Sequence, residues 1–273
     1  MTNLQVVISP AKKMRIAGTG SAADDVAPSD IPPFPEASAR LAARLKAMGR
    51  GELQALWHTS DRLTDECLGM TERLEIPGSP EDARSARLAP RLTPAALTYD
   101  GIQFRSMAPE VLDAAAFAWL QDHLWILSGL HGCVRPLDAV MPYRLEMGAR
   151  LAMDADAQGA RPSKDLYEFW GGSVARRVAE GAGVVINLAS VEYARAVVPH
   201  LGETPCVTCI FGESLRNGKP VQRSTASKAA RGSMVRWMAE RGLDDPDELR
   251  RFDVGYRCDP ELSDSSRLVF MRG

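Results

Sequence analysis

Continuous apolar runs, rather than alternating ones, mark the strands that the sequence predicts. Residues 124–127 and 184–188 lack a polar face, which is typical of strands covered on both sides inside an α/β structure. Residues 4–8 form an N-terminal strand that Ser9-Pro10 closes. The remaining predicted strands are residues 95–104, 206–211 and 268–271, and Asn217-Gly218 marks a hairpin turn.

Helical spacing of apolar residues is clearest in residues 225–241. Ala226, Ala230, Met234 and Trp237 recur there at intervals that place them on one stripe. Further helices are predicted over residues 36–48, 52–58, 62–68, 80–92, 110–122 and 165–180. Strands and helices alternate without an internal repeat or a linker. The expected fold is therefore α/β, a single mixed-sheet domain flanked by helices, over residues 1–273.

Composition narrows the class of protein further. The chain is 45% hydrophobic and 25% charged with a formal net charge of −2, so it carries no global signature of nucleic-acid binding. Val6 to Ile8 is too short for a signal peptide, and no apolar run is long enough to span a bilayer. We expect a cytoplasmic monomer without membrane contact, metal or cofactor.

The five cysteines are odd in number and scattered, which suits a reducing compartment. Cys206 and Cys209 have CxxC spacing, but they fall in a predicted strand, where residues three apart point to opposite faces. The spacing therefore favours buried thiols over a zinc site.

Polar side chains gather in the loops that follow three predicted strands. In α/β sheets such loops form ligand sites. The glycines of "SGLHG" would also let backbone amides approach a phosphate. The candidates are Ser9, Lys12, Arg135, Tyr143, Arg144, Glu146, Asn187 and Ser190. Each has a structural alternative, such as an internal Arg144–Glu146 ion pair, but as a cluster they favour a site. His131 could act as a general base if it lines a cleft; otherwise it is a packing residue.

Two further segments offer cations. From Arg216 to Arg236 the chain has six Lys or Arg residues and no Asp or Glu, with Lys228 and Arg231 on the long helix. A solvated helix explains this pattern about as well as a phosphate-binding face does. Residues 52–70, "ELQALWHTSDRLTDECLGM", predict two short helices with Arg62 at the start of the second. Such a pair can bind DNA phosphates, although it is also a common packing unit.

Five motifs in order along the chain resemble the YaaA family of bacterial peroxide-stress proteins. They are "VVISPAKKM", "LSGLHGCVRPLDAVMPYRLEMG", "KDLYEFWG", "VINLASVEYARAV" and "SKAARGSMVRWMAE". The resemblance implies a cytoplasmic protein that limits oxidative DNA damage and free iron, with a positively charged cleft and a helix-hairpin-helix element. That element corresponds to residues 53–68. Its turn lacks the usual glycines, and His131 stands where tyrosine is common.

The sequence is compatible with two functions. The first is a DNA-binding protection factor in which Lys12, Arg62, Lys228 and Arg231, with Arg135 and Arg144, contact backbone phosphates. The second is an enzyme acting on a nucleotide or nucleobase in a pocket formed by residues 128–148 and 187–193, although no known catalytic motif is present. Iron binding follows from the resemblance but not from the dispersed His and Cys residues.

Overall fold

A seven-stranded sheet forms the centre of the computed structural model, which describes residues 3–18, 20, 26–155 and 161–273. In order across the sheet the strands are β12 (Tyr256–Cys258), β13 (Arg267–Arg272), β9 (Cys206–Gly212), β8 (Val184–Asn187), β1 (Leu4–Ile8), β5 (Leu124–Ser128) and β6 (Gly132–Val134). The inner strands pair in parallel, whereas the edge strands β12 and β6 are antiparallel to their neighbours. The predicted mixed α/β sheet is therefore confirmed.

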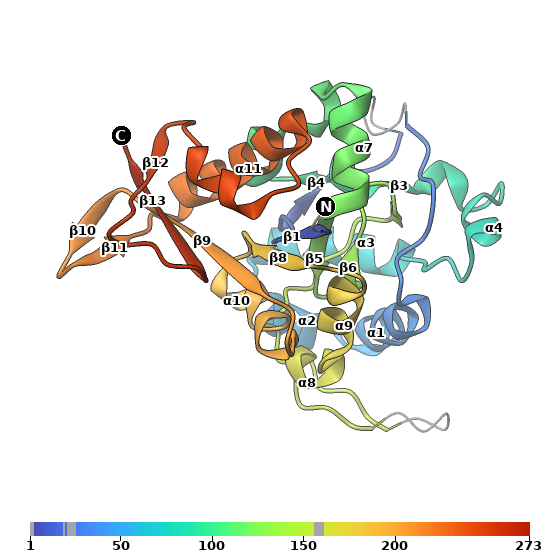
Figure 1. The fold of residues 1–273 in the computed structure, drawn as a ribbon. Coiled ribbons are helices and arrows are strands. Elements are labelled where there is room, and N and C mark those ends of the chain that lie inside the picture. The colour runs from blue at the N-terminus through green and yellow to red at the C-terminus, as the bar shows by residue number, and fades with distance from the viewer. Residues whose placement is uncertain (1–2, 19, 21–25, 156–160) are drawn as a thin grey trace.

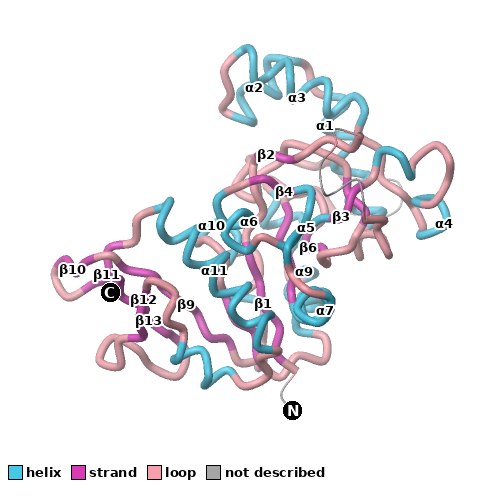
Figure 2. Tube along the Cα trace, turned by 90° about the horizontal axis from the view of Figure 1, so that it is seen from above, coloured by secondary structure: helices cyan, strands magenta, loops and turns pink. Residues whose placement is uncertain are grey.

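The order of the strands creates a switch point beside β1. From β1 the chain first adds β5 on one side, and it later returns to add β8 on the other side. Ligands in open α/β sheets bind outside the carboxyl ends of the strands at such a point. Figure 2 shows α6 (Ile102–Met107) and α10 (Val191–Ala194) beyond this end of β1.

Helices cover both faces of the sheet (Figure 1). α7 (Ala114–His123) and α11 (Ser224–Arg241) lie over one face, and α9 (Ser173–Ala179) lies against the other. The remaining helices and strands are α1 (Pro35–Ala47), α4 (Pro80–Ala83), α5 (Ala95–Thr98), α8 (Leu166–Trp170), β2 (Lys13–Met14), β3 (Thr93–Pro94), β4 (Tyr99–Asp100), β7 (Ala139–Val140), β10 (Ser214–Arg216) and β11 (Lys219–Val221). Short 3-10 turns are η2 (Ala89–Arg91), η3 (Pro109–Val111), η4 (Val198–His200) and η5 (Pro246–Arg251).

A close approach at Gly232 joins α11 to α6. A Cβ atom at this position would lie 2.0 Å from the carbonyl oxygen of Gln103, far inside van der Waals contact. Only glycine lets the two helix backbones come so near. The contact fixes the neighbouring Arg231 of α11 relative to Gln103 of α6.

The predicted helix pair is present as α2 (Arg50–Trp57) and α3 (Asp61–Arg73). α2 begins before its predicted start and ends one residue early, whereas α3 extends beyond both of its predicted bounds. They pack side by side at the end of the molecule remote from the N-terminus (Figure 2). The link of residues 58–60 contains His58 with φ of 50°, in the left-handed region. The helix pair is confirmed, whereas a helix-hairpin-helix DNA-binding role remains a prediction.

Most predicted strands are confirmed, but residues 95–104 do not form one. They fold instead as α5, β4 and the start of α6. Ala95, Ala96 and Leu97 are all buried. A short apolar run cannot by itself distinguish a buried strand from a buried helical turn, and here the surrounding core selects the helical turn.

Two predicted helices are interrupted. Residues 80–92 form only α4 and the 3-10 turn η2. Pro90 lies in the first turn of η2, a position where proline is tolerated because that N–H has no helical partner. Residues 165–180 divide at Gly171-Gly172 into α8 and α9, since glycine is a poor helix former. The helix predicted from residue 110 begins at Ala114, where the Asp113 carboxylate accepts the Ala116 N–H at 2.8 Å.

Candidate functional site

A pocket of about 530 Å³ lies at the switch point, beyond the carboxyl ends of β1 and β8. It brings together segments that are far apart in the sequence: the loop after β1, the start of α6, residues 143–146, α10 and α11. The predicted site residues that line it are Ser9, Lys12, Tyr143, Arg144, Glu146, Ser190, Lys228 and Arg231. The loops after the strands therefore converge as the sequence indicates.

Two serines connect the loops after β1 and β8. The Ser9 hydroxyl donates to the Ser190 hydroxyl at 3.1 Å and accepts the Ser190 backbone N–H at 2.9 Å. β1 and β8 are hydrogen-bonded neighbours, so the residues after each strand emerge together. The Ser9–Ser190 contact therefore fixes the edge of the pocket at the switch point.

Glu146 lies between two cations of the pocket. Its carboxylate is 2.6 Å from Lys12 Nζ and accepts a hydrogen bond from Arg144 Nη2 at 3.0 Å. The Arg144 side chain is only 11% exposed, whereas that of Lys12 is 64% exposed. A Cβ atom at Gly129 would lie 2.6 Å from the Leu145 carbonyl oxygen, so the loop carrying both ionic residues packs directly on the β5 exit.

α11 contributes two more cations to the pocket, Lys228 and Arg231. Lys228 is exposed. Burial lowers the pKa of the Arg231 guanidinium, because desolvation disfavours the charged form. A hydrogen bond from Arg231 Nη2 to the Gln222 amide oxygen, 3.5 Å long, connects it to the segment before α11.

Tyr143 connects the pocket to a buried polar network. Its hydroxyl forms hydrogen bonds with the Ser128 hydroxyl at 2.6 Å and the Tyr99 hydroxyl at 2.9 Å. The Ser128 hydroxyl also accepts the His131 backbone N–H at 2.9 Å. Burial raises the pKa of both tyrosines. These phenols therefore remain neutral and hold the floor of the pocket in place.

His131 is a packing residue and does not line the pocket. It is 1% exposed, and its Nδ1 lies 3.1 Å from the Ser38 hydroxyl. Burial lowers its pKa to about 3, so the imidazole stays neutral at ordinary pH. The fold therefore supports packing, and not general-base catalysis, as the role of His131.

The structure does not bring Arg135 to the pocket. The Arg135 guanidinium stacks 3.6 Å from the centre of the Trp125 ring and donates to the Leu124 carbonyl and the Gln5 side chain. These partners belong to the first residues of β5 and β1, at the opposite end of the sheet from the pocket. Burial lowers the pKa of Arg135 to about 10. Its contacts stabilise the fold.

Asn187 and Arg62 also lie outside the pocket. The Asn187 amide nitrogen donates to the Thr208 hydroxyl at 3.3 Å, and its oxygen accepts the Ala189 N–H at 3.0 Å. These hydrogen bonds hold the backbone that follows β8 in place. Arg62 is 92% exposed on α3 and pairs with Glu66 at 3.1 Å.

Several residues of the pocket had no signal in the sequence. Gln103, Asp100 and Arg105 line it, although the sequence indicated a strand across part of this segment. Asp100 pairs with Lys13 at 2.8 Å and with Arg105 at 2.9 Å, and these contacts lower the pKa of its carboxyl. A turn signal at Gly101 could have pointed to this segment as a loop between two elements.

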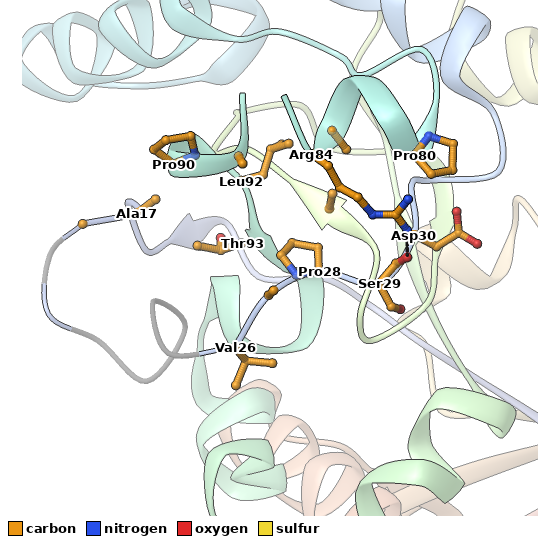
Figure 3. A pocket seen from close by; sticks show the side chains of 15 residues that line it. Ala17, Val26, Pro28, Ser29, Asp30, Pro80, Arg84, Pro90, Leu92 and Thr93 are labelled. Atoms are coloured by element: carbon orange, nitrogen blue, oxygen red, sulfur yellow. Dashed lines mark hydrogen bonds between the residues drawn. The ribbon is translucent and has the colours of Figure 1, made fainter. Parts of the chain in front are cut away.

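A second pocket, of about 480 Å³, has different chemistry (Figure 3). Pro28, Pro80, Pro90 and Leu92 surround it. Arg84 and Asp30 are the charged side chains among the described residues of its lining, and Arg84 donates to the Ser29 carbonyl at 3.4 Å. One charge of each sign gives this pocket no excess for an ionic ligand. The pocket at the switch point is therefore the stronger candidate site.

Comparison with known proteins agrees with the motifs. The sequence model of the family described as "Peroxide stress protein YaaA" matches residues 4–262. The chain belongs to this family. Similar proteins include the UPF0246 proteins of Agathobacter rectalis, 36% identical over 98% of this chain and 99% of that protein, and of Lactiplantibacillus plantarum, 36% identical with the same coverage. The UPF0246 protein of Lachnoclostridium phytofermentans is 35% identical over 99% of this chain and 97% of its own length.

The YaaA-family match thus extends over the strands, the loops and α11 that form the pocket. In the part of the chain that the structure describes, no helix is both long and apolar enough to cross a lipid bilayer.

Proposed function

We propose that this YaaA-family protein limits oxidative DNA damage during peroxide stress by binding the phosphates of DNA at the switch-point pocket. The observation that carries the proposal is the convergence of Lys12, Arg144, Lys228 and Arg231 on one pocket from three separate segments. Lys and Arg side chains that neutralise phosphates supply most of the affinity in sequence-independent DNA binding. A lowered level of free iron would be an indirect consequence.

The charge balance of the pocket supports an anionic ligand. Its cationic residues are Lys12, Lys13, Arg105, Arg144, Lys228 and Arg231, and its acidic residues are Asp100, Glu146 and Glu192. Cations therefore exceed carboxylates at this site, although the whole chain has a net charge of −2. Local excess of one sign attracts a ligand of the other sign.

The α2–α3 pair offers less for phosphate binding. Arg50 is held by Asp61 and Asp65, at 3.3 and 2.9 Å. An aspartate also occupies the first turn of α3, where it would repel a phosphate approaching the helix N-terminus. We therefore assign the main phosphate contacts to the pocket and not to this pair.

The test is fluorescence anisotropy of a labelled DNA duplex at several salt concentrations. The logarithm of the affinity should fall linearly with the logarithm of salt concentration, by a slope of about −0.9 for each phosphate neutralised. Lys228→Gln should reduce the slope by about 1. Lys46→Gln, an exposed change on α1 away from the pocket, is the matched control.

Two outcomes would contradict the proposal. Affinity that does not change with salt would exclude phosphate contacts as its source. A slope reduced by Arg62→Gln and unaffected by Lys228→Gln would instead assign the contacts to α3.

A nucleotide-directed enzyme is the second candidate. The pocket volume of about 530 Å³ lies within the range of roughly 300–1,000 Å³ typical of small-molecule sites. Glu146 faces the same space and could transfer a proton. Turnover of a nucleotide, lost in Glu146→Gln while binding remains, would support this candidate.

A further inference from the structure

Three buried hydrogen-bond donors without an acceptor belong to side chains that line the switch-point pocket. They are Gln103 Nε2, Arg144 Nε and Arg231 Nε. Buried polar groups in folded proteins are nearly always hydrogen-bonded, and leaving one unpaired destabilises the protein. Among the described residues, the other buried side-chain atoms without a partner belong to Trp57, Trp125, His131, Ser163 and Trp237, which do not line this pocket. The three at the pocket come from α6, a loop and α11 around one cavity, so a single ligand can be their common partner.

All three unpaired groups donate. A ligand that satisfied them would need several acceptor oxygens in a small volume, together with negative charge to match the two guanidinium groups. Phosphate has this character, and planar guanidinium groups bind its oxygens with paired hydrogen bonds. A neutral sugar or a nucleobase would bring donors of its own into a site that already has an excess of donors.

The charge of the ligand follows from the ion pairs within the pocket. Lys12 and Arg144 share the carboxylate of Glu146. No carboxylate partner is present for Lys228 or Arg231 among the ion pairs of the described residues. A terminal phosphate monoester carries about −1.5 to −2 near pH 7, whereas a phosphate inside a nucleic-acid strand carries about one negative charge. The group of Lys12, Arg144 and Glu146 keeps one net positive charge, and the unpaired Arg231 adds a second, so this part of the pocket matches the monoester better.

The inner side of the pocket is closed by buried side chains. Phe104 is 3% exposed, Tyr143 5%, and Tyr193 7%, and all three line the pocket. A continuous strand would need an exit on this side. A phosphate at the end of a strand, or on a mononucleotide, can enter from solvent and stop against this floor.

We propose that the switch-point pocket binds a terminal phosphate monoester between Arg144 and Arg231, with the Gln103 amide as a further donor. The proposal rests on the proposed function and deepens it. Internal phosphates of DNA contact the exposed cations at the rim, Lys12 and Lys228, and the end of a strand occupies the pocket. The protein then prefers DNA ends, or nicks, that carry a phosphate.

Competition binding tests this preference directly. Two nicked duplexes of identical sequence carry a fluorophore on an internal base, one with a 5′-phosphate at the nick and one with a 5′-hydroxyl. The phosphorylated duplex should bind about tenfold tighter or more. A nucleoside monophosphate and inorganic phosphate should displace it, and the corresponding nucleoside should not.

Variants of the pocket locate the effect. Arg231→Gln should remove most of the preference for the phosphorylated nick while leaving part of the affinity for the duplex. Gln103→Leu should reduce the preference as well. Since buried changes can disturb folding, circular dichroism accompanies them. Lys228→Gln, at the rim, should weaken the binding of both duplexes and leave the preference intact, and Lys46→Gln should retain both the affinity and the preference.

The outcomes separate this inference from the proposed function. Equal binding of both nicked duplexes, with a steep dependence on salt, would overturn the terminal-phosphate site and leave DNA binding intact. Binding of the nucleoside monophosphate without binding of any duplex would support the site and refute the DNA-binding function. A preference that persists in both Arg231→Gln and Gln103→Leu would also overturn the site.

Discussion

Gly232→Ala tests whether the contact between α11 and α6 has the geometry described. Helix propensity alone predicts that alanine stabilises a helix by about 1 kcal/mol relative to glycine. At Gly232 the new methyl group would lie 2.0 Å from the Gln103 carbonyl oxygen and 3.0 Å from the Ser106 Cβ atom. Because the first of these is a backbone atom, the two helices must separate.

Overpacking typically costs about 1–3 kcal/mol, and an approach of 2.0 Å to a backbone atom puts this substitution at the upper end, about 3 kcal/mol. After the gain in propensity is subtracted, the net loss is about 2 kcal/mol, which lowers the melting temperature by roughly 4–8 °C in a domain of this size. Gly51, in the first turn of α2, is the matched control, because a Cβ atom there meets nothing within 4 Å. Gly51→Ala should be neutral or slightly stabilising.

Thermal unfolding followed by circular dichroism measures both variants. Gly232→Ala should also weaken phosphate binding, since the same contact positions Arg231 against Gln103 across the pocket. A Gly232→Ala protein that melts at or above the wild-type temperature would refute the close approach, and with it the argument that α11 and α6 form a fixed wall of the site.

Other substitutions test the buried groups. Burial raises the pKa of Asp138 to about 7, whereas an aspartate of the unfolded chain ionises near pH 4. The folded protein therefore loses stability as pH rises from about 4 to 7, because only the unfolded chain readily gives up this proton over that range. Asp138→Asn should therefore gain stability relative to wild type as pH rises over that range, in urea unfolding at pH 4.5 and 7.5; an unchanged difference would contradict the raised pKa. The acid sensitivity of His131, whose pKa is lowered to about 3, has the opposite sign and cancels in this comparison. Tyr143→Phe should cost about 1–3 kcal/mol in the same assay, because Ser128 and Tyr99 lose their shared partner, and a change within error would exclude a structural role for that hydroxyl.

The strands and the main helix follow directly from the sequence. Apolar runs without alternation locate β1, β5 and β8, since strands of a parallel sheet are buried on both faces. Helical spacing locates α11. The polar loops after these strands also meet as expected, because parallel neighbours end at one edge of the sheet.

Tertiary contacts decided the rest. Residues 95–104 have the apolar character of a strand, yet the core around them selects α5, β4 and α6, and this placement brings Gln103 to the pocket. The role of Arg135 could likewise not be predicted from the residues next to it in the sequence, since its partners Trp125 and Gln5 lie 10 and 130 residues away.

The sequence by itself determined the α/β class and the loops that follow the strands, because these depend on local composition and periodicity. Only the tertiary structure decided which cations share the pocket and which are held elsewhere. Lys12 and Arg144 meet at Glu146, whereas Arg62 pairs with Glu66 on α3. The physical reason is that a charge acts through its distance to its neighbours and its exposure to solvent, and the folded chain alone fixes both.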